Sequence, residues 1–269
     1  MHIRVTLRSA AAAIALTAAA TGAQANDFFP GSGFPSDDPF TLSQAGASTS
    51  AGVGARNVGI TGKNVSGTPT VSAGGFSVKD ASDRFIAWCL DTLKNLELGT
   101  EYTLNNLNPF TTGPSLSTQQ KDDIQDLFNF GYDTFLGSID PDDNGVGSAN
   151  NNQSAGFQVA LWEIVNETGG TYDAGVGNPT TGFRTTDSTI AGIANDYLAL
   201  IDPLSSTYTG IIGNNGLGYR VSYLESTGDP TRQNLVTVSP VPLPAAGVLM
   251  LAALGGLAGS RKLRRRAEA

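Results

Sequence analysis

The chain of 269 residues contains one histidine, His2, and one cysteine, Cys89. His2 lies in an N-terminal segment whose pattern predicts removal during export. The mature chain then has no imidazole, which excludes Ser-His-Asp and Cys-His catalysis and any histidine-ligated metal. A single cysteine excludes an intramolecular disulfide and a cysteine-based zinc cage. The fold must therefore be stabilised by apolar burial, and hydrophobic residues make up 40% of the chain, which is enough for a core.

Residues 1–25 have the pattern of a secretory signal peptide. Arg4 and Arg8 precede the apolar run 9–21, and a small-x-small sequence ends at Ala25. This order of charge, apolar segment and cleavage site predicts export, with cleavage after Ala25. A buried alanine-rich helix is the alternative, and the terminal position and flanking charges disfavour it.

The C-terminal residues 240–269 show a similar set of features in a different order. A short motif is followed by the apolar stretch 245–259 and then by a cluster of five cations. The motif consists of Val241, Pro242, Leu243 and Pro244. A helix over the apolar stretch is marginally long enough to span a membrane, and its cations predict a cytoplasmic end.

This order of motif, transmembrane helix and basic tail resembles the PEP-CTERM sorting signal of Gram-negative bacteria, in its Val-Pro-Leu-Pro-Ala variant. The chain departs from the commoner form at Leu243, where that form has Glu. The resemblance implies transient anchoring in the inner membrane and recognition by an exosortase-type protease that removes the tail. It further implies that the product reaches the cell surface or the medium. A C-terminal anchor that is never cleaved is the alternative.

The charge of the mature chain limits its partners. Removing both terminal segments takes away seven basic residues and one acidic residue, so the net charge falls from −8 to −14. An acidic exported domain repels nucleic acid and anionic lipid. We therefore expect no nucleic-acid partner.

The region between the two signals predicts one α+β domain. Residues 26–54 are rich in Gly, Ser, Pro and Asp, and indicate a flexible leader or an irregular strand edge. Residues 55–239 predict an antiparallel sheet, with a barrel-like core and a helical insert. Strands are expected at these positions: within 58–78, at 85–90, 102–107, 207–212, 217–224 and 235–238.

Three helices are expected in the middle of the domain. Ser117 and Gln120 have the spacing of a capping box, and apolar residues follow with helical period to about residue 136. A second helix is expected over 153–167. The third, over 187–201, begins at the N-cap residue Asp187 and ends before a proline.

The segment 140–145 has oxygen ligands at alternating positions and glycine at the sixth, as in a calcium-binding loop. The candidate ligands are Asp140, Asp142 and Asn144. The twelfth position is Asn151 instead of the bidentate Glu of such loops. An ordinary Asp-Gly-rich turn is therefore the favoured interpretation, with weak calcium binding as the alternative.

Two segments, 87–91 and 156–162, contain the most informative pair of residues, Cys89 and Gln158. They are similar to the two signature segments of bacterial surface thioester domains, an aromatic-Cys-aliphatic strand and a Gln-x-Ala-aliphatic-Trp helix start. The chain departs from that pattern at Phe157, where those adhesins have Thr, and at Leu161, where they have Ile. The resemblance implies an intramolecular thioester between Cys89 Sγ and Gln158 Cδ.

The thioester hypothesis assigns roles to five residues around the pair. Aromatic side chains at Trp88, Phe157 and Trp162 are expected to screen the thioester from water, and Asp91 or Glu163 to move the proton. The thioester would acylate an amine. In the alternative, Cys89 is a small buried hydrophobe and Gln158 only hydrogen-bonds to the backbone.

Three classes of function follow from these observations. The first is a covalent adhesin that acts through the thioester on an amine-bearing surface molecule. The second is a passive structural or polysaccharide-binding protein of the extracellular matrix. The third, a hydrolase, would need a carboxylate pair, and neither such a pair nor an aromatic sugar platform stands out from the sequence. We therefore expect adhesion or retention in extracellular polysaccharide and no enzymatic turnover.

Overall fold

The structure is a computed structural model of the whole chain. It describes residues 39–44, 52–62, 65–80, 84–104, 116–136, 148–167, 172–175, 182–201, 218–227 and 232–240. The expected signal peptide, the sorting signal from residue 241, the strand at 207–212 and the calcium candidates Asp140, Asp142 and Asn144 lie outside these residues.

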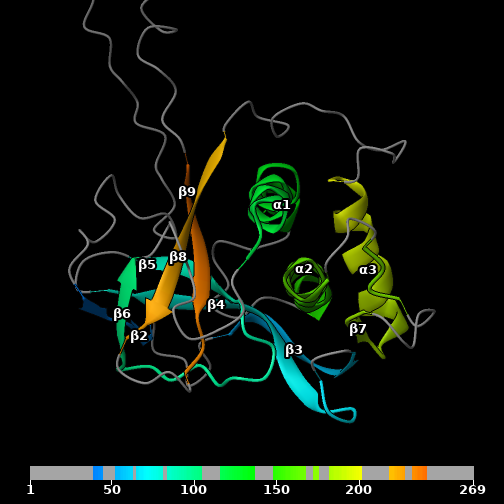
Figure 1. Cartoon of the computed structure of the whole chain (residues 1–269), viewed down its shortest axis with the longest axis horizontal. Coiled ribbons are helices and arrows are strands. Elements are labelled where there is room, and N and C mark those ends of the chain that lie inside the picture. The colour runs from blue at the N-terminus through cyan, green and yellow to red at the C-terminus, as the bar shows by residue number, and fades with distance from the viewer. Residues whose placement is uncertain are drawn as a thin grey trace, which may run out of the picture.

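The described part of the chain is α+β, as predicted, with one antiparallel sheet and three helices (Figure 1). The strands are β1 (Phe40–Thr41), β2 (Ser43–Gln44), β3 (Gly52–Thr61), β4 (Thr70–Lys79), β5 (Arg84–Cys89), β6 (Glu101–Leu104), β7 (Arg184–Thr185), β8 (Tyr219–Ser226) and β9 (Leu235–Pro240). Their order is β1-β6-β8-β9-β5-β4-β3-β7, and β2 pairs with β4. No pairing joins β1 to β7 within the described ranges, so the sheet is open there and the expected barrel-like closure is not seen.

The sheet begins earlier in the chain than residue 55. Phe40 of β1 pairs with Tyr102 of β6, and Ser43 of β2 pairs with Lys79 of β4. Leu42 between them is fully buried. For residues 40–44 the irregular strand edge is therefore the correct interpretation, and the flexible leader is not. The sequence did not predict these pairings because both strands are two residues long.

Helix α1 (Thr118–Leu136) begins where the capping box predicts. The Gln120 backbone N–H donates to Ser117 Oγ (3.2 Å), and the Ser117 N–H donates to Gln120 Oε1 (2.9 Å). Helix α3 (Ser188–Ala199) is capped by Asp187, whose carboxylate accepts from the N–H groups of Thr189 and Ile190. Both predicted starts are confirmed, because capping is a local interaction that the sequence encodes directly.

Helix α2 (Ser148–Asn166) begins five residues before the predicted start at Gln153. The asparagines of this first turn have low helix propensity, so the sequence alone indicated a loop. Asn152 instead accepts a hydrogen bond from the guanidinium of Arg56 on β3. This contact between distant parts of the sequence stabilises the early turns of the helix.

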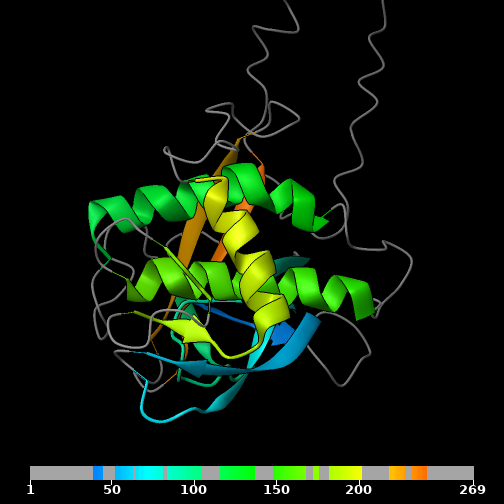
Figure 2. The ribbon, with the colours of Figure 1, turned by 90° about the vertical axis from the view of Figure 1, so that its right-hand side faces the viewer.

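Helix α2 contacts β3, β4 and β5 of the sheet and lies between the other two helices. Figure 2 shows α1 and α2 side by side, with α3 crossing them. The close approach of α2 and α3 requires glycine at position 156, since a Cβ there would lie 2.4 Å from Ile193 Cγ2. Within the described residues, no helix is long and apolar enough to span a membrane.

Candidate functional site

The structure brings Cys89 and Gln158 into direct contact. Cys89 is the last residue of β5, and Gln158 lies in the middle of α2. The Cys89 backbone N–H donates to Gln158 Oε1 (2.9 Å), and Gln158 Nε2 donates to the Cys89 carbonyl oxygen (2.7 Å). The Gln158 side chain is fully buried and the Cys89 side chain almost so. Both polar ends of the amide are thus bonded to the residue that carries the thiol.

This contact occupies a break in the sheet. The pairing of β4 with β5 ends at Phe76 and Ala87, so no β4 residue pairs with Cys89. One turn before Gln158 on α2, Ser154 Oγ accepts from the Gly75 N–H of β4 (3.1 Å). Helix α2 therefore supplies side chains that replace strand pairing where β4 and β5 separate, and this fixes the height and rotation of Gln158 above Cys89.

The arrangement has two possible uses, and the hydrogen bonds are compatible with both. In a non-covalent role, the amide satisfies the buried Cys89 N–H and C=O, which would be costly to leave unpaired. In a covalent role, the Cys89 N–H polarises the Gln158 carbonyl, and the Cys89 carbonyl holds the nitrogen that leaves as ammonia. The same geometry therefore serves either as structural pairing or as preparation for attack by the thiol.

The Cys89 thiol is protonated at neutral pH. Burial raises its pKa well above the ordinary value, and the charge of Asp91 raises the pKa further. Since the thiolate is the nucleophilic form, the buried thiol is a weak nucleophile unless its proton is removed. This environment preserves the side chain from oxidation and requires close placement of the electrophile.

Asp91 is close to Cys89 and is held in place by three groups. Its Oδ2 accepts from the Asn234 N–H (2.8 Å), its Oδ1 lies 3.4 Å from Lys94 Nζ, and its backbone carbonyl accepts from Gln233 Nε2 (2.6 Å). Burial raises the pKa of Asp91, while the bond from Asn234 and the charge of Lys94 lower it. Of the two proton carriers suggested by the sequence, Asp91 is the one near the thiol.

Glu163 lies elsewhere, although it is buried. Its Oε1 accepts from the Asp173 N–H (2.9 Å), and its Oε2 has no hydrogen-bond partner among the described residues. Burial raises its pKa to about 8. Glu163 does not contribute to the shift in the pKa of Cys89, and it does not line the pocket beside that residue. The structure therefore does not bring Glu163 together with the candidate thioester.

The aromatic residues expected to surround the pair divide into two groups. Trp88 and Phe157 pack on each other, with ring centroids 4.6 Å apart, in a cluster that also contains Tyr132 and Phe128. Trp162, one turn beyond Gln158, contacts Phe183 instead, at 6.1 Å. The first group forms part of the buried core, whereas Trp162 lines a pocket together with Cys89. Screening of the pair from water by these rings stays a prediction.

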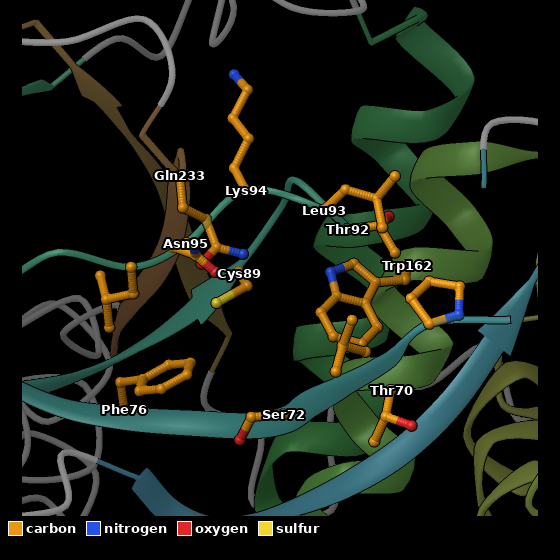
Figure 3. Close-up of a pocket in the computed structure, with 13 residues that line it drawn as sticks. Thr70, Ser72, Phe76, Cys89, Thr92, Leu93, Lys94, Asn95, Trp162 and Gln233 are labelled. Carbon is orange, nitrogen blue, oxygen red and sulfur yellow. The ribbon is translucent and has the colours of Figure 1, made fainter. Parts of the chain in front are cut away.

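A pocket of about 550 Å³ opens beside Cys89 (Figure 3). Its lining includes Trp162, the loop after β5 and residues of β4. In Figure 3 the Cys89 sulfur and the indole nitrogen of Trp162 are both directed into this space. The pocket therefore gives the buried sulfur a route to an outside molecule, which the sequence did not predict.

Three residues of this site were not identified from the sequence. Ser154 is fully buried, and Gln233 and Asn234 immediately before β9 are almost so. Gln233 and Asn234 stand directly before an apolar strand, and this position could have indicated a structural role, because buried amides hydrogen-bond to groups that need partners. Their partners, Asp91 and Ser226, could not be found without the fold.

The described residues contain no group of three or more His, Cys, Asp or Glu side chains that could hold a metal ion. Calcium binding by Asp140, Asp142 and Asn144 remains a prediction. No family model matches the chain, and neither a curated protein nor a solved structure matches it.

Proposed function

We propose that this is an exported surface or extracellular-matrix protein whose Cys89 and Gln158 form an internal thioester, through which it attaches to a nucleophile outside the cell. The single observation that carries the proposal is the pair of hydrogen bonds between the Gln158 amide and the Cys89 backbone. They place the amide carbon beside the only cysteine of the chain, at a point that opens into a pocket.

The chemistry has two balanced steps. In the first, Cys89 Sγ attacks Gln158 Cδ, the C–N bond breaks, and the thiol proton leaves with the nitrogen as ammonia. In the second, an amine or hydroxyl attacks the thioester carbonyl, the C–S bond breaks, and the proton returns to the sulfur. Helix α2 and strand β5 hold the Gln158 amide on the backbone of Cys89, and such fixed placement lowers the entropic cost of attack on an amide. The reaction occurs once in each molecule, so it is attachment and not enzymatic turnover.

Intact mass spectrometry of the exported protein tests this proposal. The wild-type chain is expected to be lighter than its sequence mass by one ammonia, and methylamine is expected to add to Gln158 and release the thiol. The variants Cys89→Ala and Gln158→Glu serve as controls, and neither should lose ammonia or react. A wild-type mass equal to the sequence mass, with no methylamine adduct, would contradict the thioester.

A passive matrix protein is the second candidate function, and the same hydrogen bonds favour it. The amide of Gln158 pairs the backbone of Cys89 without any covalent bond, so the fold does not need the thioester. In that case the chain would be retained in extracellular polysaccharide by non-covalent contacts. Retention in the matrix by the Cys89→Ala variant, at the wild-type level, would identify this function.

Sorting by an exosortase-type protease completes the proposal and rests on the terminal sequences. We expect the mature product to begin at Asn26 and to end near Pro244, so that residues 245–269 are absent. Terminal peptides of the protein recovered from a Gram-negative host with an exosortase test this expectation. A product that retains Ala269 at the surface would instead identify an uncleaved membrane anchor.

A further inference from the structure

The described lining of the pocket beside Cys89 lacks acidic groups. None of its thirteen lining residues is Asp or Glu, within the part of the chain that the structure describes. Among the described residues of the lining, Lys94 is the only charged one. Its ammonium lies 3.4 Å from Asp91 Oδ1, and in Figure 3 it is directed away from the Cys89 sulfur. The described lining therefore presents no charged group toward the reacting atoms.

The pocket instead presents neutral hydrogen-bonding groups. Hydroxyls and amides come from Thr70, Ser72, Thr92, Asn95 and Gln233. Trp162 adds a donor, because its side chain is 1% exposed and its Nε1 has no hydrogen-bond partner among the described residues. A buried donor without a partner costs about 1–3 kcal/mol. An acceptor oxygen of a bound molecule in the pocket would remove this cost.

These features separate two classes of acceptor for the acyl group. A lysine ammonium would lose its hydration in the pocket without a free carboxylate to replace it, because the nearby Asp91 is already paired with Lys94. The lysine would also have to lose a proton before attack. A sugar hydroxyl enters without charge and offers acceptor oxygens to Trp162 and the amides. Phe76 supplies an apolar surface for the C–H groups of a sugar ring.

We propose that this pocket binds a neutral sugar unit of an extracellular polysaccharide, and that one of its hydroxyls receives the acyl group of Gln158. The inference rests on the proposed thioester and names its acceptor. The hydroxyl oxygen forms an ester with Gln158 Cδ, the C–S bond breaks, and the hydroxyl proton passes to Cys89 Sγ. The product is an ester between the protein and the polysaccharide, with a free thiol.

Binding is tested separately from transfer. The exported Cys89→Ala variant, which cannot form the thioester, is titrated calorimetrically with neutral oligosaccharides of glucose, galactose, mannose and N-acetylglucosamine. At least one should bind, and Trp162→Phe in the same background should weaken that binding about tenfold, as expected for one lost hydrogen bond. Glu101→Gln, an exposed change on β6, is the control. Absence of binding by all four would overturn the inference and leave the thioester untouched.

Transfer is tested with the wild-type protein, offered the bound oligosaccharide or a lysine-containing peptide. The expected product is an oligosaccharide adduct at Gln158 that hydroxylamine cleaves, as it cleaves an ester and not an amide. Ser72→Asp places a carboxylate at an exposed position of the lining and should shift transfer toward the peptide about tenfold, while Ser72→Asn should not. Preference of the wild type for the lysine peptide would overturn the inference. An intact wild-type mass that shows no loss of ammonia would instead overturn the thioester itself.

Discussion

Replacement of Gln158 by methionine isolates the contribution of its amide to stability. Methionine fills a similar volume, so the change removes two buried hydrogen bonds with little loss of packing. The Cys89 N–H and C=O then lack partners in a site that excludes water, and each costs about 1–3 kcal/mol. We therefore expect Gln158→Met to lower the free energy of unfolding by about 2–6 kcal/mol.

Urea denaturation of the exported protein, followed by tryptophan fluorescence, measures this change. Gln153→Met is the matched control on the same helix, because Gln153 accepts one bond from the Tyr197 hydroxyl at a half-buried position (2.9 Å). We expect the control to cost about 1 kcal/mol or less. Both substitutions are made in a chain that also carries Cys89→Ala, so that no thioester contributes to the difference in stability.

The reasoning would be refuted by a small effect. If Gln158→Met in the Cys89→Ala background costs no more than Gln153→Met, the amide does not satisfy the backbone of residue 89. The break between β4 and β5 would then be stabilised by other groups, and the placement of Gln158 beside Cys89 would lose its physical basis.

Three further predictions follow from the same structure. Methylamine treatment should lower the stability of the wild type in urea denaturation, because it opens a loop whose ends are 69 residues apart. The chain-entropy treatment of cross-links gives a loss of about 4 kcal/mol. The Cys89→Ala variant should show no such change. Glu163 has a pKa of about 8 in the folded chain against an ordinary 4.5, so the folded state holds its proton more tightly and stability should fall as pH rises through this interval. The loss of stability should be on the order of 3 kcal/mol by pH 8, measured by thermal unfolding from pH 5 to 8. Glu163→Gln keeps the acceptor for the Asp173 N–H and should remove this loss. Asp187→Ala removes an N-cap that accepts two N–H groups and should cost about 1 kcal/mol in urea denaturation, whereas an unchanged midpoint would show that α3 is held by packing alone.

The sequence predicted those parts of the fold that depend on neighbours along the chain. The starts of α1 and α3 were correct because Ser117 and Asp187 bond to N–H groups within three residues of themselves. The central strand β5 was found from its run of apolar residues. The early start of α2 could not be found, since it depends on Arg56, far away on β3.

The candidate site divides in the same way. Cys89 and Gln158 were selected because the short segments around them resemble the two signature segments of thioester domains, and such motifs are local. Glu163 is only five residues from Gln158 along the chain, so the sequence suggested that the two side chains share a site. The fold was needed to show that Glu163 instead bonds to the Asp173 N–H. The lack of acidic residues in the described lining also required the fold, since this lining comes from β4, the loop after β5, α2 and Gln233 near the start of β9.

Burial of the reacting pair has opposite effects on the two steps of the proposed chemistry. It raises the pKa of the Cys89 thiol, which slows formation of the thioester, and it excludes water, which slows loss of the thioester by hydrolysis. Formation needs to occur only once during maturation, whereas the product must survive until the protein meets its target. A buried sulfur beside a pocket is therefore a better solution than an exposed one. The opening must then admit the acceptor and little else. Its described lining has no acidic residue, and the Trp162 N–H has no hydrogen-bond partner among the described residues, so these are the features suited to that selection.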